Sequence, residues 1–247
     1  MSEQETFISH LIELRDRLLH ALIAIGVAFV PCFVFARDLY TLLATPLIAK
    51  LPAGSQMIAT DVTGAFFVPL KVAMMVAFLI ALPYVLYQVW AFIAPGLYQN
   101  EKKLAIPLIV TSTLLFFVGM AFAYFAVFPM VFKFVVAYTP VGVAMMTDIN
   151  HYLSFVLSLF LAFGVTFETP VAVIILVRMG IVTVEKLREI RPYVVVGAFV
   201  IGAIFTPPDI VSQFMLAIPI WILYEVGIVL ASWMAKAKVA EDQESTA

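Results

Sequence analysis

Charge is scarce in this sequence. Only 12% of the 247 residues are charged, whereas a soluble domain carries about a quarter charged residues. The formal net charge is -2, so no basic field suggests binding to nucleic acid. Hydrophobic residues make up 64% of the chain, and the mean hydropathy is +1.09. This composition excludes a soluble globular protein and predicts an all-α protein with several membrane spans.

Cysteine and enzyme motifs are also lacking. The one cysteine, Cys32, lies in an apolar run, so no internal disulfide can form and we expect it to be a packing residue. The sequence contains no Walker loop, dinucleotide fingerprint or H-E-x-x-H motif, and its three histidines are dispersed. Ser154 and Ser158 share a helix face without a basic partner nearby in sequence, which is typical of helix packing. We therefore expect no enzyme, no cofactor and no metal site.

A basic signal-peptide start is missing from the N-terminus, which reads MSEQETF, so we expect the first apolar run to remain as a span. About 20 apolar residues in a helix cross a hydrocarbon core of roughly 30 Å. The expected spans are residues 19–36, 66–92, 104–132, 152–177, 193–205 and 210–234. The fifth is only about 20 Å long as a helix. The sixth is interrupted by Gln213, Pro219 and Glu225, so we expect a short hairpin that thins the bilayer.

The segments outside these runs differ in character. Residues 1–18 have an apolar face at helical spacing, which predicts a helix on the membrane surface. Residues 37–65 are expected to form a long structured loop in which Pro46 breaks an amphipathic stretch, and MIATDVTG is compatible with an extended conformation. A second long loop covers 133–151. Residues 1–234 are expected to form one transmembrane domain, and the polar tail 235–247 is expected to be disordered.

The distribution of basic residues predicts the orientation. Six spans place both termini on one side of the membrane. Ten of the 14 lysines and arginines then fall on the side of the N-terminus, and the other side holds only Arg37, Lys50, Lys71 and Lys133. Because basic residues are retained in the cytoplasm, both termini are expected to be cytoplasmic.

Glu168 is the only charged residue of the run 152–177. An acid at that depth costs at least ~2.5 kcal/mol on insertion scales. Pro170 removes a backbone donor and is expected to bend the helix, and the hydroxyls of Thr166 and Thr169 can bond the freed carbonyls. Two interpretations remain open: a protonated acid at a helix contact, or a functional acid facing a polar cavity, as in a proton-coupled small-molecule transporter.

Two further acids, Glu13 and Glu101, lie just outside spans on the side of the N-terminus. Each has an ordinary explanation, because Glu13 is four residues from Arg17 and Glu101 precedes Lys102 and Lys103. Such surface pairs contribute only ~0.3–0.5 kcal/mol. If both acids face one groove, they would instead form a receptor for adjacent arginines, since carboxylates bind guanidinium groups bidentately.

Seven motifs spread over nearly the whole chain resemble the TatC family, the multispanning receptor subunits of the twin-arginine protein translocase, in its proteobacterial form. The motifs are HLIELRDRL (10–18), PLI (46–48), MIATDVTGAFFVPLK (57–71), YQVWAFIAPGLYQNEKK (87–103), SFVLSLFLAFGVTFETPV (154–171), RPYVVVGAFVIGAIFTPPD (191–209) and LAIPIWILYEVG (216–227).

The resemblance implies a glove-shaped, six-span protein of the bacterial cytoplasmic membrane with a concave face. It would bind paired-arginine signal peptides of folded precursors, associate with itself and with the single-span subunits TatA and TatB, and be driven by the proton-motive force. The implied signal-peptide site comprises Glu13, Leu14, Arg15, Arg17, Phe92, Pro95, Tyr98 and Glu101. The remaining family positions are the intramembrane Glu168, the loop residues Pro46 and Asp209, and the partner-docking Thr206 and Gln213.

Overall fold

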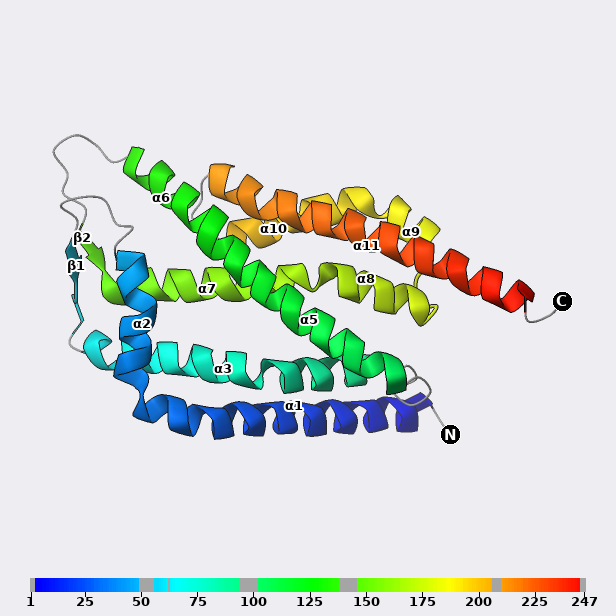
Figure 1. The fold of residues 1–247 in the computed structure, drawn as a ribbon, viewed down its shortest axis with the longest axis horizontal. Helices are drawn as coiled ribbons and strands as arrows, with labels where there is room; N and C mark the ends of the chain where they lie inside the picture. The colour runs from blue at the N-terminus through cyan, green and yellow to red at the C-terminus, as the bar shows by residue number, and fades with distance from the viewer. Residues whose placement is uncertain are drawn as a thin grey trace. The chain divides into compact units, whose positions relative to one another are not determined.

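The computed structural model describes residues 3–48, 56–61, 63–93, 102–137, 146–205 and 210–244. These residues are helical apart from two short strands and the connecting turns (Figure 1). Five helical segments of the described chain are long and apolar enough to cross a membrane, and the helix Arg191–Phe205 is apolar but shorter. The five are Ile8–Val34, Phe66–Ile93, Ile106–Val131, Ile149–Arg178 and Gln213–Met234. The predicted all-α multispan class is confirmed.

Contacts divide the chain into two compact units. Unit 1 contains Met1–Thr113 and Val135–Leu157, and unit 2 contains Leu114–Phe134 and Ser158–Ala247. Whether both belong to the single transmembrane domain expected over residues 1–234 stays a prediction.

Three helices lie wholly within unit 1, namely α1 (Glu3–Val34), α2 (Ala36–Ile48) and α3 (Gly64–Ile93). Helices α1 and α3 lie side by side, and α2 packs against α3 (Figure 1). Cys32, Ala73 and Ala77 form a buried cluster between them. Small side chains let neighbouring helices approach closely. The prediction that Cys32 is a packing residue is therefore confirmed.

Two expectations about the N-terminal third were wrong. A separate surface helix over residues 1–18 does not exist, because α1 is one continuous helix from Glu3 to Val34. No glycine or proline interrupts the chain between its surface part and its span. Pro46 also does not break the following segment, since α2 continues to Ile48. A proline in the last turn removes a single backbone hydrogen bond, so the helix tolerates it.

The two long loops are joined by a pair of parallel strands. Strand β1 (Gln56–Ile58) pairs with β2 (Met146–Asp148), with Gln56 opposite Met146. The extended conformation expected for the start of MIATDVTG is thus present. Its partner strand was not expected, because three residues are too few to show the alternation of a strand.

The third apolar run is helical from Lys102 to Ala137, with a π-helical turn in its middle. The turn η1 (Ala123–Val127) separates α5 (Lys102–Phe122) from α6 (Phe128–Ala137). The backbone N–H of Phe128 donates to the carbonyl of Ala123, five residues back. Pro129 follows directly, and in a regular α-helix its ring would clash with the carbonyl four residues earlier. The wider turn relieves that clash.

The remaining helices are α7 (Ile149–Phe167), α8 (Thr169–Arg178), α9 (Val184–Glu189), α10 (Arg191–Phe205) and α11 (Ile210–Glu244). In unit 2, α11 packs against α8 and α10. The short helix α9 is joined to α11 by the hydroxyl of Tyr224, which donates to the carbonyl of Leu187 at 2.8 Å. The helix α10 has 15 residues, which confirms the expected shortness of the fifth run.

The sixth run and the tail differ from expectation. The apolar segment Gln213–Met234 has 22 residues, so it is not short. Pro219 lies inside α11 without ending it, and Glu225 is bound by Nη2 of Arg191 at 2.6 Å, which offsets its charge. Helix α11 also continues to Glu244, through most of the segment expected to be disordered. That segment, AKAKVAEDQE, is rich in strong helix formers.

Gly119 determines how closely α5 approaches α7 within unit 2. A Cβ atom there would lie 2.4 Å from the backbone oxygen of Phe163. We expect Gly119→Ala to lower the free energy of unfolding by about 1–3 kcal/mol, because the helices must separate. Thermal unfolding in detergent micelles measures this. Gly197→Ala on α10 is the control, since nothing lies within 4 Å of its Cβ position. Equal stability of the two variants would contradict the close approach.

Candidate functional site

Glu13 lies in a polar contact between α1 and α3. Nε and Nη2 of Arg17 both donate to Oε1 of Glu13, at 2.9 and 2.7 Å, and Nη1 of Arg17 donates to Oε1 of Gln88 at 3.3 Å. The side chains of Glu13 and Arg17 are 36% and 26% exposed, whereas Gln88 is only 7% exposed. The ordinary i,i+4 pair is therefore present, and a buried amide of α3 fixes it in place.

Aromatic contact extends this site by one helical turn on each helix. The ring of His10 stacks on Phe92, with centroids 4.4 Å apart and an interplanar angle of 21°. His10, Glu13 and Arg17 share one face of α1 by spacing, and Gln88 and Phe92 share one face of α3. We call these five residues the α1–α3 site. It offers a partly exposed carboxylate beside an aromatic surface.

The other residues expected at the signal-peptide site have different environments or lie outside the described residues. Arg15 binds Asp16 at 2.7 Å, away from Glu13, and its side chain is 65% exposed. Leu14 is exposed. Pro95, Tyr98 and Glu101 lie outside the described residues. His10 and Gln88 were missed at the sequence level, although a lone amide inside the apolar run 66–92 was a visible signal.

Glu168 lies at a break between two helices. Helix α7 ends at Phe167, and Glu168 occupies the N-cap position of α8, with Pro170 in the first turn. The break replaces the bend expected at Pro170, because a proline restricts the residues before it and clashes with the preceding turn. Glu168 is only 9% exposed. Its burial is common to both interpretations of this acid.

The backbone at this break is compensated by a neighbouring side chain. Pro170 has no N–H to donate to the carbonyl of Thr166, four residues earlier. The hydroxyl of Thr169 donates to that carbonyl instead, at 2.6 Å. The prediction that a flanking threonine bonds a freed carbonyl is confirmed for Thr169. Helix α11 approaches the start of α8 closely, since a Cβ at Gly227 would lie 3.0 Å from Cα of Pro170.

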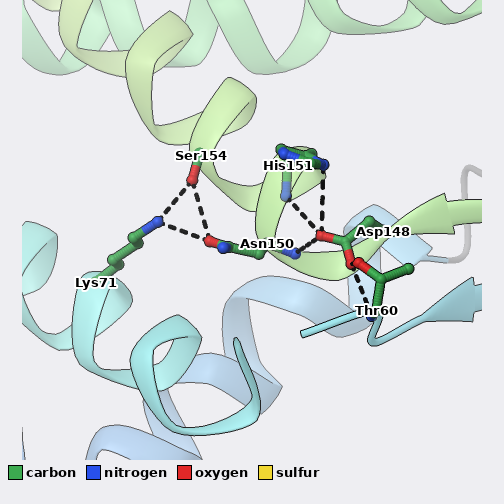
Figure 2. A network of polar contacts seen from close by, with 6 residues as sticks. All are labelled: Thr60, Lys71, Asp148, Asn150, His151 and Ser154. Atoms are coloured by element: carbon green, nitrogen blue, oxygen red, sulfur yellow. Dashed lines mark hydrogen bonds and ion pairs between the residues drawn. The ribbon is translucent and has the colours of Figure 1, made fainter. Parts of the chain in front are cut away.

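A polar network in unit 1 joins the two loops to the helices (Figure 2). Oδ2 of Asp148 accepts hydrogen bonds from the backbone N–H of Thr60, at 2.9 Å, and from its hydroxyl. Oδ1 accepts from the backbone N–H groups of Asn150 and His151, which caps α7. Nζ of Lys71 donates to Asn150 at 2.7 Å and to Ser154 at 2.9 Å. Lys71 is about 25 Å along α3 from Gln88, at 1.5 Å per residue, so this network is separate from the α1–α3 site.

Acid should weaken this network. Hydrogen bonds from Thr60 hold the pKa of Asp148 well below its ordinary value of 3.8, with further backbone donors at His151 and Asn150. A carboxyl whose pKa is lowered by folding stabilises the fold above its unfolded pKa and stops doing so as the pH falls through the lowered value. We expect the unfolding temperature to fall with the pH below about pH 4.

Asp148→Asn should unfold at a lower temperature at neutral pH and show a flatter dependence below about pH 4. Thermal unfolding of the purified protein across pH 2–7 measures both effects. Asp38→Asn changes an exposed acid of α2 and serves as the control. A variant at position 148 with the acid dependence of the unaltered protein would contradict the role of Asp148.

The other expected positions are placed as follows. Gln213 is half-buried on α11 and packs against α10. A Cβ atom added at Gly202 of α10 would lie 3.3 Å from the backbone oxygen of Gln213 and 3.5 Å from its Cα and Cγ atoms. Pro46 lies in α2. Thr206 and Asp209 lie outside the described residues. Docking of a partner at Thr206 and Gln213 thus stays a prediction.

Comparisons with known proteins agree with one another. The family model described as Sec-independent protein translocase protein (TatC) matches residues 9–219. TatC of Escherichia coli is 55% identical over 230 residues, which cover 92% of this chain and 89% of that protein. TatC of Aquifex aeolicus is 39% identical over 231 residues, with 93% of this chain and 95% of that protein covered.

Solved structures show the same likeness. A crystal structure described as the twin arginine translocase receptor TatC matches with a TM-score of 0.80 and 40% identity, covering 91% of this chain and 98% of that one. A second, obtained in the detergent DDM, gives a TM-score of 0.79 at 39% identity. With a family model over most of its length and relatives matched nearly end to end, the chain belongs to the TatC family of Sec-independent protein translocase proteins.

Proposed function

We propose that this chain is the receptor of a twin-arginine translocase and that the α1–α3 site binds the paired arginines of signal peptides. The observation that carries the proposal is that Glu13 already holds a guanidinium group, that of Arg17, at 2.7 Å. A carboxylate that binds one guanidinium in this setting has the chemistry to bind another. The family membership supports the same function, since its members are protein translocase subunits.

Neighbouring groups suit a signal peptide. Such peptides carry an apolar stretch after the arginines, and the exposed side chains of Leu11, Leu14 and Leu18 offer apolar surface on α1 beside Glu13. Glu101 is expected to supply a second carboxylate. Binding would therefore combine two charge-assisted hydrogen bonds with burial of apolar area.

Orientation, shape and partners complete the proposal. Both termini would be cytoplasmic, with the short helix α10 as a sixth span and a concave face toward the substrate. The single-span subunits TatA and TatB would dock near Thr206 and Gln213, further copies of the chain would join the receptor complex, and the proton-motive force would drive export. The positive-inside count supports the orientation, and the family supports the rest. The alternative, a proton-coupled small-molecule transporter using Glu168, has no such support.

Equilibrium binding tests the proposal. A fluorescent twin-arginine signal peptide is titrated with the purified protein in lipid nanodiscs, and a twin-lysine peptide is the matched control. We expect the lysine peptide to bind at least about 10-fold more weakly, because an ammonium group lacks the planar fork of N–H donors that a guanidinium group presents to a carboxylate. Equal affinities would contradict recognition of paired arginines.

A further inference from the structure

Gln88 is a buried amide in an apolar helix, and Arg17 is its hydrogen-bond partner. We propose that Gln88 is a specificity-determining positioning residue: it holds Arg17 so that Arg17 fixes the carboxylate of Glu13 in one orientation, with one oxygen presented to an incoming guanidinium group. The inference rests on the proposed function of the α1–α3 site and adds a residue to it.

Arg17 bonds to only one of the two carboxylate oxygens of Glu13. Both of its contacts to Glu13, from Nε and Nη2, end on the same oxygen, Oε1. Within the described part of the chain, Oε2 of Glu13 accepts no hydrogen bond. The two oxygens of an ionised carboxylate together offer about four lone-pair acceptor sites, so Oε2 retains acceptor capacity for a second guanidinium.

Gln88 keeps Arg17 from moving freely with Glu13. Its Oε1 accepts from Nη1 of Arg17 at 3.3 Å, and Gln88 is only 7% exposed. A buried acceptor that loses its partner is costly, because water does not replace the lost bond. Full displacement of Arg17 by a signal-peptide arginine is therefore disfavoured. The contact instead couples α3 to the orientation of the Glu13 side chain.

A fixed carboxylate favours arginine over lysine. The guanidinium group is a planar fork whose hydrogen bonds need the acceptor in a defined direction, whereas the lysine ammonium is a compact charge with rotatable donors. Loss of the fixed orientation should thus weaken binding of an arginine peptide more than binding of a lysine peptide. A general loss of stability would weaken both alike.

The test measures the dissociation constants of a twin-arginine and a twin-lysine signal peptide for three variants in nanodiscs. Gln88→Leu removes the acceptor and keeps the side-chain size. We expect it to weaken the arginine peptide about 3- to 10-fold, as expected when one side chain must be ordered on binding, and the lysine peptide less than about 2-fold. Ser112→Ala is the matched control. Trp90, which lies on α3 like Gln88, donates a buried hydrogen bond to the hydroxyl of Ser112 on α5 at 2.9 Å, and this variant removes that bond without touching Arg17. It should leave the ratio of the two constants unchanged.

Glu13→Gln distinguishes failure of the proposed role of Gln88 from failure of the proposed function of the α1–α3 site. If Glu13→Gln weakens the arginine peptide while Gln88→Leu preserves the affinities and their ratio, the role of Gln88 is overturned and the proposed function stands. Equal weakening of both peptides by Gln88→Leu also overturns it, since that is a structural effect. If Glu13→Gln leaves arginine-peptide binding intact, the α1–α3 site itself is wrong. The inference is supported if the dissociation constant of the lysine peptide divided by that of the arginine peptide falls in Gln88→Leu and stays unchanged in Ser112→Ala.

Discussion

Glu13→Lys is expected to abolish measurable binding of a twin-arginine signal peptide. A hydrogen bond to a charged group contributes about 1.5–3 kcal/mol, and the new lysine adds repulsion against both the arginines of the peptide and Arg17. We expect the dissociation constant to rise at least about 100-fold. The same change at Glu101 should act in the same direction.

The control for this charge reversal is Asp16→Lys. Asp16 lies on the same helix and binds Arg15 instead of Arg17, and its side chain is 48% exposed. The two variants change the net charge equally, so a purely long-range effect would weaken binding to the same extent in both. We expect Asp16→Lys to change the affinity by less than about 5-fold in physiological salt. Comparable losses in the two variants would contradict direct contact at Glu13.

Glu168→Ala is expected to leave peptide binding at the α1–α3 site intact and to impair transport strongly. Loss of one polar contact of about 1.4 kcal/mol at the rate-limiting step lowers the initial rate of transport about 10-fold, so we expect an effect of at least that size. Glu168 lies in unit 2, at the break between α7 and α8, and is buried. A buried carboxyl in a span is costly to maintain, which favours a role after the initial docking. Export of a folded precursor into membrane vesicles measures the effect.

Glu168→Gln extends this experiment. Glutamine keeps the size and hydrogen-bonding capacity of the side chain but cannot ionise. Transport restored by glutamine would assign Glu168 a hydrogen-bonding role, and transport lost in both variants would assign it a role as an ionisable acid. Unimpaired export by Glu168→Ala would contradict any transport role and return Glu168 to helix packing.

The membrane spans were the most predictable part of the fold. Uninterrupted apolar runs of bilayer length must form helices, since hydrocarbon offers no partner for the backbone. Hydropathy does not mark where such helices end. Thus α1 reaches back to Glu3 and α11 continues to Glu244, because their polar ends contain good helix formers and no breaker.

Local backbone chemistry was predictable as well. The loss of the Pro170 donor and its compensation by a neighbouring threonine follow from residues within one turn, and Thr169 makes that bond. The position of the break at Glu168 was not predicted, because a proline can be accommodated by a bend or by a break.

Contacts between distant segments were beyond the sequence. Gln88 is 71 residues from Arg17, and Thr60 is 88 residues from Asp148. Which faces of two apolar helices meet depends on their rotation and register, and nearly uniform hydrophobicity along α3 gives no clue to either. The role of Glu13 could be proposed from the family resemblance, whereas the amide that positions its partner required the structure.

Photocrosslinking from the signal peptide tests whether the α1–α3 site receives the paired arginines. A photoreactive residue is placed next to the arginines of a signal peptide, so the chain itself stays unaltered, and adducts are mapped by mass spectrometry. We expect adducts within residues 10–17 of α1 and 88–93 of α3. Excess unlabelled arginine peptide should suppress them, and the twin-lysine peptide should give much weaker adducts. Adducts confined to unit 2, or equal adducts from both peptides, would contradict binding of the paired arginines at the α1–α3 site.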